Sequence, residues 1–529
     1  LEKSESLESL ENSKELNNEP FEEKIGLLNE TTDTQQNTQD IEKNQNIHNV
    51  SVEPILEKVE EEEKNESNNE VANNEVSKAI SSGNSLRNSQ KEEIPVESST
   101  YLLSLKELAF VSYGGAPLLE SIEKKNEIEK LKYGSFVKTL QKIEVDGVSY
   151  SKIVYFGKEL NSEVKIGWTK TVNLSFVEKL LKTSEEVIFK DLKKIPGRVR
   201  KVRGIYISRH TASMKSNLDR FADFAKRTNL NAFVIDVKDD DGFMLFQSLV
   251  APKYAQKANK LATYSKDEIK EIIKELKAKG FYLIARIVCF KDPTYASAHL
   301  DRAIVYKETG QPYMGIYKVP WASAYDRQLW QYNIDVAKEA IEVGFDEIQY
   351  DYVRFPELTK EDRMLVNLRQ VGNESMSEAI YKFLVKSKME LATYNIPLAA
   401  DIFGLVSTAV DDMGIGQYWE LVSSAVDYVC PMVYPSHYAK GSFGLSVPDA
   451  YPYEVVYRSV FDGLVRNRLL STPAKVRPWI QAFTATWVKG HIQYGENEIR
   501  KQIKALKDLG IEEYMLWNAS NRYLEMKYE

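Results

Sequence analysis

Two aspartates interrupt stretches whose other residues are mostly apolar or aromatic. Asp351 lies in EIQYDYVRFP (347–356) and Asp401 lies in PLAADIF (397–403). Burial of a carboxyl group and repulsion from a second carboxylate both raise a pKa, so such a pair supplies one ionised and one protonated group. In glycosidases one carboxylate attacks the sugar and the other carboxyl group protonates the leaving oxygen. We therefore predict Asp351 and Asp401 as catalytic residues, against the alternative that one of them caps a helix or pairs with Arg286.

Polar and aromatic side chains also follow the other apolar stretches of the second half of the chain. If these stretches are parallel strands of one sheet, the side chains meet where the carboxyl ends of the strands lie. Aromatic faces suit pyranose rings, and polar groups suit sugar hydroxyls. The residues predicted to bind substrate are Asp236, Lys238, Arg286, Arg354, Tyr434, His437, Gln481, Trp517 and Asn518. Arg354 has a second interpretation, as the ion-pair partner of Asp351.

The acidic segment DVKDDDG (236–242) raises the question of a cation site. It lacks EF-hand spacing, so a tight turn with hydrated carboxylates is the simpler interpretation of Asp240 and Asp241. The five histidines form no HExxH motif, and neither a GxSxG elbow nor a P-loop is present. Cys289 and Cys430 lie in apolar runs, which favours buried free thiols over a disulfide or a metal site. We predict neither a metal nor a cofactor.

The elements that must position these residues are eight apolar runs separated by amphipathic helical patterns. One such pattern spans residues 266–280, which Ser265 caps and Gly280 ends. Parallel strands need helical crossovers, and eight of them over about 320 residues close into a (β/α)₈ TIM barrel. The alternative is an open doubly wound sheet, which usually begins with a Gly-rich turn that GIYISRHTA lacks. The apolar runs span residues 204–208, 232–237, 281–290, 346–351, 397–403, 427–434, 476–483 and 513–518.

In this barrel Asp351 ends the fourth strand and Asp401 belongs to the fifth. Neighbouring strands lie about 4.8 Å apart. The two carboxyl groups can therefore approach the separation of about 5–5.5 Å that a retaining glycosidase requires.

The first hundred residues differ from the rest in composition and charge. Residues 1–99 hold 24 Asp and Glu against 9 Lys and Arg, with few aromatics, so we predict an acidic disordered tail over residues 1–98. Short β-type runs between Gly-rich and charged turns predict a small all-β barrel over residues 99–178. Residues 179–529 are the predicted TIM-barrel domain. No Lys/Arg tract indicates nucleic-acid binding, and no run of about 18 apolar residues indicates a transmembrane helix.

The stretches AFVIDVKDDDG, DEIQYDYVRFP, DYVCPMVYPSHY and YMLWNASNRY resemble a bacterial glycosyl hydrolase family, whose TIM barrel is related to the α-amylase-like superfamily. The resemblance covers roughly residues 200–525 and implies that Asp351 is the nucleophile and Asp401 the acid/base. The chain departs from amylases, which have Glu at the second position and Arg two residues before the nucleophile. Gln481 also stands where amylases have a third Asp.

The segment that begins GAPLLES and ends with Gly167-Trp168 resembles a bacterial Src-homology-three-like domain. This resemblance implies attachment to a cell-wall polymer, and the alternative is a small barrel that only packs on the main domain. We expect a leader to have been removed before Leu1 and a location in the cell envelope, periplasmic or surface-exposed, with the cytoplasm as the alternative.

These inferences combine into one functional prediction, a glycoside hydrolase that acts on a polysaccharide or cell-wall glycan by a retaining two-carboxylate mechanism. The alternative is a non-catalytic glycan-binding or envelope scaffold protein on an inactive TIM barrel.

Overall fold

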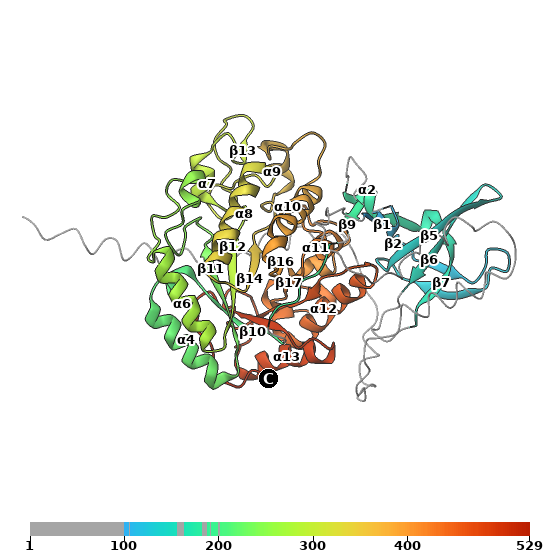
Figure 1. The fold of residues 1–529 in the computed structure, drawn as a ribbon. Coiled ribbons are helices and arrows are strands. Elements are labelled where there is room, and N and C mark those ends of the chain that lie inside the picture. Colours follow the sequence, from blue (N-terminus) through green and yellow to red (C-terminus); the bar gives the residue numbers. More distant parts are fainter. Residues whose placement is uncertain (1–99, 105, 156–162, 182–187, 191, 199–200) are drawn as a thin grey trace, which may run out of the picture.

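The computed structural model describes residues 100–104, 106–155, 163–181, 188–190, 192–198 and 201–529 (Figure 1). They form a small antiparallel sheet beside a large closed barrel. The acidic tail predicted over residues 1–98 lies outside the described residues. Every helix in the described ranges is too short or too polar to cross a membrane.

The large barrel is a ring of eight parallel strands, of which the seventh is divided in two. Pairing of β16 with β17 closes the ring. The predicted (β/α)₈ barrel is therefore confirmed, and each strand overlaps one of the eight apolar runs. The strands are β10 (Arg203–Ile207), β11 (Ala232–Lys238), β12 (Tyr282–Val288), β14 (Glu347–Asp351), β16 (Leu398–Phe403), β17 (Tyr428–Met432), β18 (Lys475–Val476), β19 (Trp479–Gln481) and β20 (Tyr514–Trp517).

Helices cover the outside of the barrel (Figure 1). Helix α6 begins at a capping box, in which Ser265 and Glu268 each accept from the other's backbone N–H. The chain turns after this helix at Gly280, whose φ is +96°. The helices are α3 (Arg209–Ala212), α4 (Lys215–Thr228), α5 (Ala251–Tyr254), α6 (Lys266–Ala278), α7 (Pro293–Ala298), α8 (Arg327–Glu342), α9 (Lys360–Leu365), α10 (Met376–Leu391), α11 (Trp419–Ala425), α12 (Pro452–Asn467) and α13 (Glu496–Asp508).

Strand β14 shows how residue alternation builds the interior of the barrel. Ile348 and Tyr350 belong to the apolar core between the strands and the helices. Glu347, Gln349 and Asp351 point the other way, where each forms hydrogen bonds across the interior. Because successive side chains of a strand face opposite sides, the sequence EIQYD places a polar group at three levels of the barrel. Asp351 occupies the level at the carboxyl end.

The small sheet has seven antiparallel strands in the order β4-β3-β7-β6-β5-β2-β8. Its own core includes Val111, Leu118, Val137 and Ile153, all fully buried. The predicted likeness to a Src-homology-three-like domain stays a prediction. The strands are β2 (Leu108–Val111), β3 (Ala116–Leu119), β4 (Glu127–Leu131), β5 (Phe136–Val145), β6 (Val148–Tyr155), β7 (Lys165–Lys170) and β8 (Leu174–Phe176).

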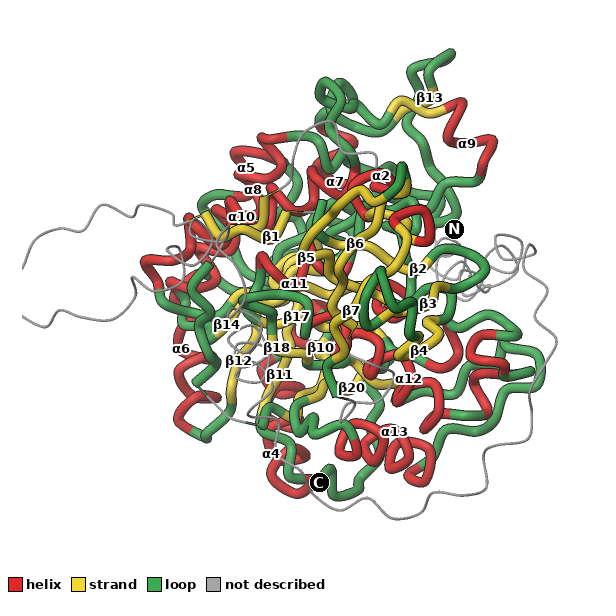
Figure 2. Tube along the Cα trace, turned by 90° about the vertical axis from the view of Figure 1, so that its right-hand side faces the viewer, coloured by secondary structure: helices red, strands yellow, loops and turns green. Residues whose placement is uncertain are grey.

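The small sheet packs directly on the barrel, in front of which it lies in Figure 2. Leu108 and two residues of helix α2 (Val177–Leu181) are buried in the same apolar cluster as the helices of the barrel. The guanidinium of Arg466, on α12, lies 4.3 Å from the centre of the Phe136 ring. The ribbon β1 (Thr100–Ser104) and β9 (Ile188–Lys190) joins the start of the described chain to the segment before the barrel.

The loops after β12 and β14 build a raised wall at the carboxyl end of the barrel. Within them β13 (Val305–Tyr306) pairs with β15 (Val366–Asn367). Tyr313, Trp321 and Leu358 form a separate apolar cluster that supports this wall. The wall therefore has its own core and does not depend on the barrel interior alone.

Candidate active site

Asp351, the last residue of β14, is almost fully buried at the carboxyl end of the barrel. Its Oδ2 accepts hydrogen bonds from Nε (3.0 Å) and Nη2 (2.5 Å) of Arg286, on the neighbouring strand β12. Its Oδ1 accepts one from the backbone N–H of Tyr352 (2.5 Å), whose φ is +46°. Three charge-assisted hydrogen bonds therefore fix the orientation of this carboxylate.

Arg286 also reaches a second carboxylate, that of Asp236 on β11. Its Nη1 donates to Oδ1 of Asp236 (2.5 Å), and the Tyr206 hydroxyl donates to Oδ2 (2.6 Å). Burial raises the pKa of Asp236 to about 6, although Arg286 and Tyr206 act in the opposite direction. One buried guanidinium thus bridges the ends of β11 and β14.

Asp401, on β16, is the inward-facing neighbour of Asp351. Tyr350 is paired in register with Ala400, so the next residues of the two strands, Asp351 and Asp401, lie side by side. Oδ1 of Asp401 accepts hydrogen bonds from Trp479 Nε1 (2.8 Å) and from the side-chain amide of Gln349. Burial, and then the charge of Asp351, raise the pKa of Asp401 well above its usual value. Asp351 and Asp401 therefore occupy electrostatically different environments.

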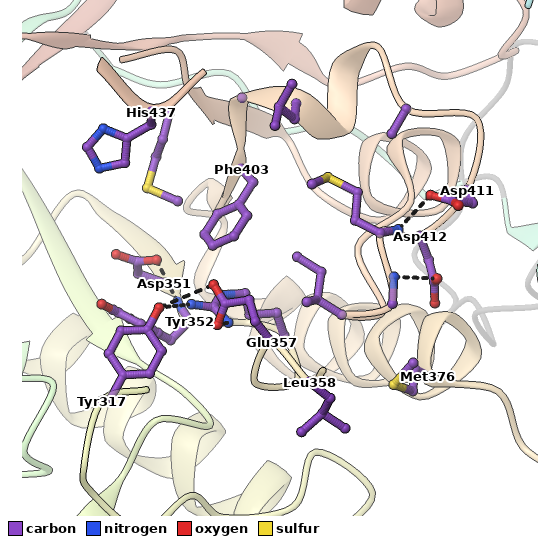
Figure 3. Close-up of a pocket in the computed structure, with 18 of the residues that line it drawn as sticks. Tyr317, Asp351, Tyr352, Glu357, Leu358, Met376, Phe403, Asp411, Asp412 and His437 are labelled. Carbon is purple, nitrogen blue, oxygen red and sulfur yellow. Dashed lines mark hydrogen bonds and ion pairs between the residues drawn. The ribbon is translucent and has the colours of Figure 1, made fainter. Parts of the chain in front are cut away.

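A cavity of about 1290 Å³ opens at this end of the barrel. In Figure 3, Asp351, Tyr317, Glu357 and Phe403 lie towards one end of the cavity, and Asp412 and Met376 lie towards the other. Most of its wall comes from the loops after β14, β16 and β17. Leu180 and Leu181 of helix α2 also line it, so the region next to the small sheet contributes to the wall.

The predicted site residues divide into two groups by their position relative to this cavity. Those that line it are Arg286, Asp351, Arg354, Tyr434, His437 and Trp517. Asp401 is 1% exposed and Asp236 2% exposed; both lie behind the wall, in contact with residues of the first group.

Lys238, Gln481 and Asn518 do not line the cavity, because each is engaged in supporting a loop. Lys238 is fully buried and forms an ion pair with Asp292 (2.7 Å). The Gln481 side-chain oxygen accepts from the backbone N–H and the hydroxyl of Ser436, which fixes the turn that carries His437. The Asn518 amide donates to the backbone carbonyls of residues 482 and 522. The side chains of these three residues are buried groups at strand ends, as the sequence indicated. They stabilise the loops around the cavity but do not themselves line it.

Arg354 pairs with a residue that sequence reasoning missed. Its Nη1 donates to Glu357 (2.9 Å), and its Nη2 donates to the hydroxyl of Tyr317 (2.8 Å). The partner of Asp351 is Arg286 on the neighbouring strand β12, which is the alternative pairing that the sequence left open. Tyr317 and Glu357 belong to long loops, whose position no strand or helix pattern in the sequence specifies.

Asp240 also lines the cavity, although the sequence indicated a hydrated turn at this position. Its Oδ2 accepts from the ammonium of Lys291 (2.7 Å). Burial acts to raise the pKa of Asp240, but Lys291 and Arg286 outweigh it and the pKa is lowered. The DDDG segment therefore contributes one ionised carboxylate to the cavity.

Aromatic rings form the surface next to the carboxylates. The rings of Tyr206 and Trp517 stack with their centres 4.1 Å apart, and the Tyr434 ring is stacked with Trp517 at 6.4 Å. The buried hydroxyl of Tyr434 has no hydrogen-bond partner among the described residues. Burial lowers the pKa of His437 to about 4, so this imidazole is neutral at pH 7. The site therefore offers flat apolar faces with a few polar groups between them.

Neither of the two cysteines lines the cavity. Cys289 and Cys430 are buried free thiols, as predicted. Within the part of the chain that the structure describes, no three His, Cys, Asp or Glu side chains are grouped so as to hold a metal ion.

Several solved structures are similar to this chain. A hypothetical protein from Ruminiclostridium thermocellum ATCC 27405 is 29% identical, over 40% of this chain and 98% of its own, with a TM-score of 0.32. The spore cortex-lytic enzyme SleL of Bacillus cereus is 14% identical, over 69% and 76%, with a TM-score of 0.34. The α-galactosidase TtGalA of Thermus thermophilus is 13% identical, over 79% and 83%, with a TM-score of 0.41.

A comparison with curated proteins finds no match. A family model described as "Putative glycosyl hydrolase domain" matches residues 204–523, which begin with β10 and include all eight strands of the barrel. Because this match spans more than half of the chain, the protein belongs to this glycosyl hydrolase family.

Proposed function

We propose that the protein hydrolyses a glycosidic bond of a polysaccharide or cell-envelope glycan, with Asp351 as nucleophile and Asp401 as acid/base. The observation that carries this proposal is the contrast between two side-by-side carboxyl groups. Asp351 forms an ion pair with Arg286, whereas the pKa of Asp401 is raised well above its usual value by burial and by Asp351. Opposite environments for two neighbouring carboxyl groups are what an attacking and a protonating residue require.

The reaction proceeds in two steps. In the first, a carboxylate oxygen of Asp351 forms a bond to the anomeric carbon while the glycosidic bond breaks and the leaving oxygen takes the proton of Asp401. In the second, water attacks the anomeric carbon, gives a proton to Asp401 and releases Asp351. Both hydrogen bonds that Asp401 accepts go to Oδ1, which leaves Oδ2 to carry the transferred proton. Two inversions give net retention of configuration.

The size and lining of the cavity support a polymeric carbohydrate substrate. A volume of about 1290 Å³ exceeds the range of about 300–1,000 Å³ typical of sites for a single small ligand. Tyr206, Trp517 and Tyr434 line the cavity together with Asp351 and supply aromatic surface for contact with pyranose rings. Arg354 and Glu357 line the same cavity and present polar groups for sugar hydroxyls.

The competing function is a glycan-binding protein without hydrolytic activity. The observation in its favour is the burial of Asp401, which is 1% exposed and does not line the cavity. A catalytic Asp401 must therefore approach the substrate by a small side-chain rotation when the cavity is filled.

An assay of the full chain on a broad panel of glycans separates the two functions. Hydrolysis is measured as the release of reducing ends. We expect the wild type to cleave at least one polymer, and Asp351→Asn to abolish cleavage while it still binds that polymer. Asp411→Asn, which removes an exposed carboxylate from the far end of the cavity, is the matched control and should retain activity. Wild-type protein that binds a glycan but cleaves none would assign the binding function instead.

A further inference from the structure

A second depression, which we call the α4 groove, lies between helix α4 and the loop after β20. Its volume is about 530 Å³, and His210, Arg220, Arg227, Arg522 and Tyr523 line it. Among the described residues that line the groove, none is an aspartate or a glutamate. The groove is therefore cationic, whereas five carboxylates line the large cavity.

Two of the three guanidinium groups in the α4 groove are available to a ligand. Arg220, Phe224 and Arg227 recur at helical spacing, so they lie on one face of α4, and Arg522 comes from the loop after β20. Arg227 is paired with Glu525 (2.7 Å). Arg220 and Arg522 form no ion pair with any described residue, and the guanidinium of Arg220 lies 5.5 Å from the ring centre of its neighbour Phe221. Two arginines without an ion-pair partner among the described residues, which come from two elements and line one groove, are suited to bind an oxyanion.

The α4 groove and the large cavity border the same loop after β20. Ala519 lines the large cavity, and the next residue, Ser520, lines the groove. This loop is held in place by Asn521, whose amide donates to the carbonyl of Tyr206 (3.1 Å), a residue of the cavity wall. The two depressions therefore lie on either side of one well-held loop.

We propose that the α4 groove binds an anionic group, a carboxylate, sulfate or phosphate, on the same glycan chain that occupies the large cavity. This inference rests on the proposed function and adds that the substrate is an acidic glycan. Arg220 and Arg522 pair with the anionic oxygens because a guanidinium presents several N–H groups in a fixed fork. Phe224 and Tyr523 supply apolar faces for the sugar ring that carries the group.

Binding to defined polymers tests this proposal. The full chain carrying Asp351→Asn, so that polymers stay intact, is titrated calorimetrically with oligogalacturonate, dextran sulfate, a glycerol-phosphate polymer and neutral dextran. We expect binding of at least one anionic polymer, weakened by added salt, and the polymer that binds identifies the anionic group. Arg220→Glu and Arg522→Glu should each weaken this binding by about tenfold or more, the effect of one charge-assisted hydrogen bond.

The matched control is Lys226→Glu, which makes the same charge change on an exposed residue of α4 outside the groove. It should change the affinity less than threefold, and all variants should keep the wild-type melting temperature. Equal weakening by Arg220→Glu and Lys226→Glu, or neutral dextran bound as tightly as the anionic polymers, overturns the proposal. Hydrolysis by Asp351→Asn protein would refute the catalytic assignment and leave the binding result standing, so the two failures are distinguishable.

Discussion

Replacement of Asp401 by Asn tests the electrostatic argument without knowledge of the substrate. Both hydrogen bonds to Asp401 end on Oδ1, from Trp479 and Gln349, and the carbonyl oxygen of Asn accepts both. The amide NH₂ then takes the place of the protonated Oδ2. The raised pKa implies that Asp401 is protonated in the folded protein. Asn has nearly the same shape and hydrogen-bonding groups as this protonated form but does not titrate.

The sign of the effect follows from proton linkage. Above pH 3.8, the ordinary pKa of the group, the unfolded chain loses the Asp401 proton while the folded protein keeps it. The wild type therefore loses stability as the pH rises towards the folded-state pKa, by at most about 1.4 kcal/mol per pH unit. The Asn variant lacks this loss, so its free energy of unfolding should increase relative to wild type across the same interval.

Urea denaturation at a series of pH values from 4.5 to 7.5 measures this difference. Tryptophan fluorescence reports the barrel, because six of the seven tryptophans lie in it and only Trp168 lies in the small sheet. Asp411→Asn, at an exposed position, is the control and should follow the wild type. A stability difference between Asp401→Asn and wild type that stays constant with pH, or that favours wild type as the pH rises, would show that the pKa of Asp401 is not raised in the folded protein.

Three further predictions concern the residues around Asp351. Arg286→Lys should lower the free energy of unfolding by about 3 kcal/mol or more, because an ammonium group keeps at most one of three charge-assisted hydrogen bonds; a urea titration that shows less than 1 kcal/mol contradicts this. Asp236→Asn should remove the fall in wild-type stability as the pH rises from about 4 to 6, since the pKa of Asp236 is about 6; an unchanged pH profile of unfolding contradicts it. Gly404→Ala should cost about 1–3 kcal/mol, because its Cβ would lie 2.6 Å from the carbonyl oxygen of Met432; an unchanged melting temperature argues against this close approach.

The positions of Asp351 and Asp401 on neighbouring strands could be predicted from the sequence. Parallel strands bury both faces and read as apolar runs, so a charged residue within such a run is conspicuous. Asp351 and Asp401 stand out in this way, and the count of strands placed them on neighbours. The structure adds the register, in which Tyr350 opposes Ala400 and the two aspartates fall side by side.

The sequence left two ion-pair partners open for Asp351, Arg354 and Arg286, and the structure shows Arg286. Arg354 is close to Asp351 in sequence, but the turn at Tyr352 directs it to Glu357. Arg286 lies on another strand, 65 residues away, and pairs with Asp351 because both side chains point into the barrel. Separation along the chain does not indicate which inward-facing groups of a closed barrel meet.

The sequence by itself determined the eight-stranded barrel, because hydrophobic periodicity and helix caps are local properties of the chain. It also determined which strands carry carboxylates at their ends. Only the tertiary structure decided that Lys238, Gln481 and Asn518 support loops, while Asp240 lines the cavity. Loop positions and ion-pair partners depend on contacts between segments that are distant in the sequence, and no local pattern of residues encodes such contacts.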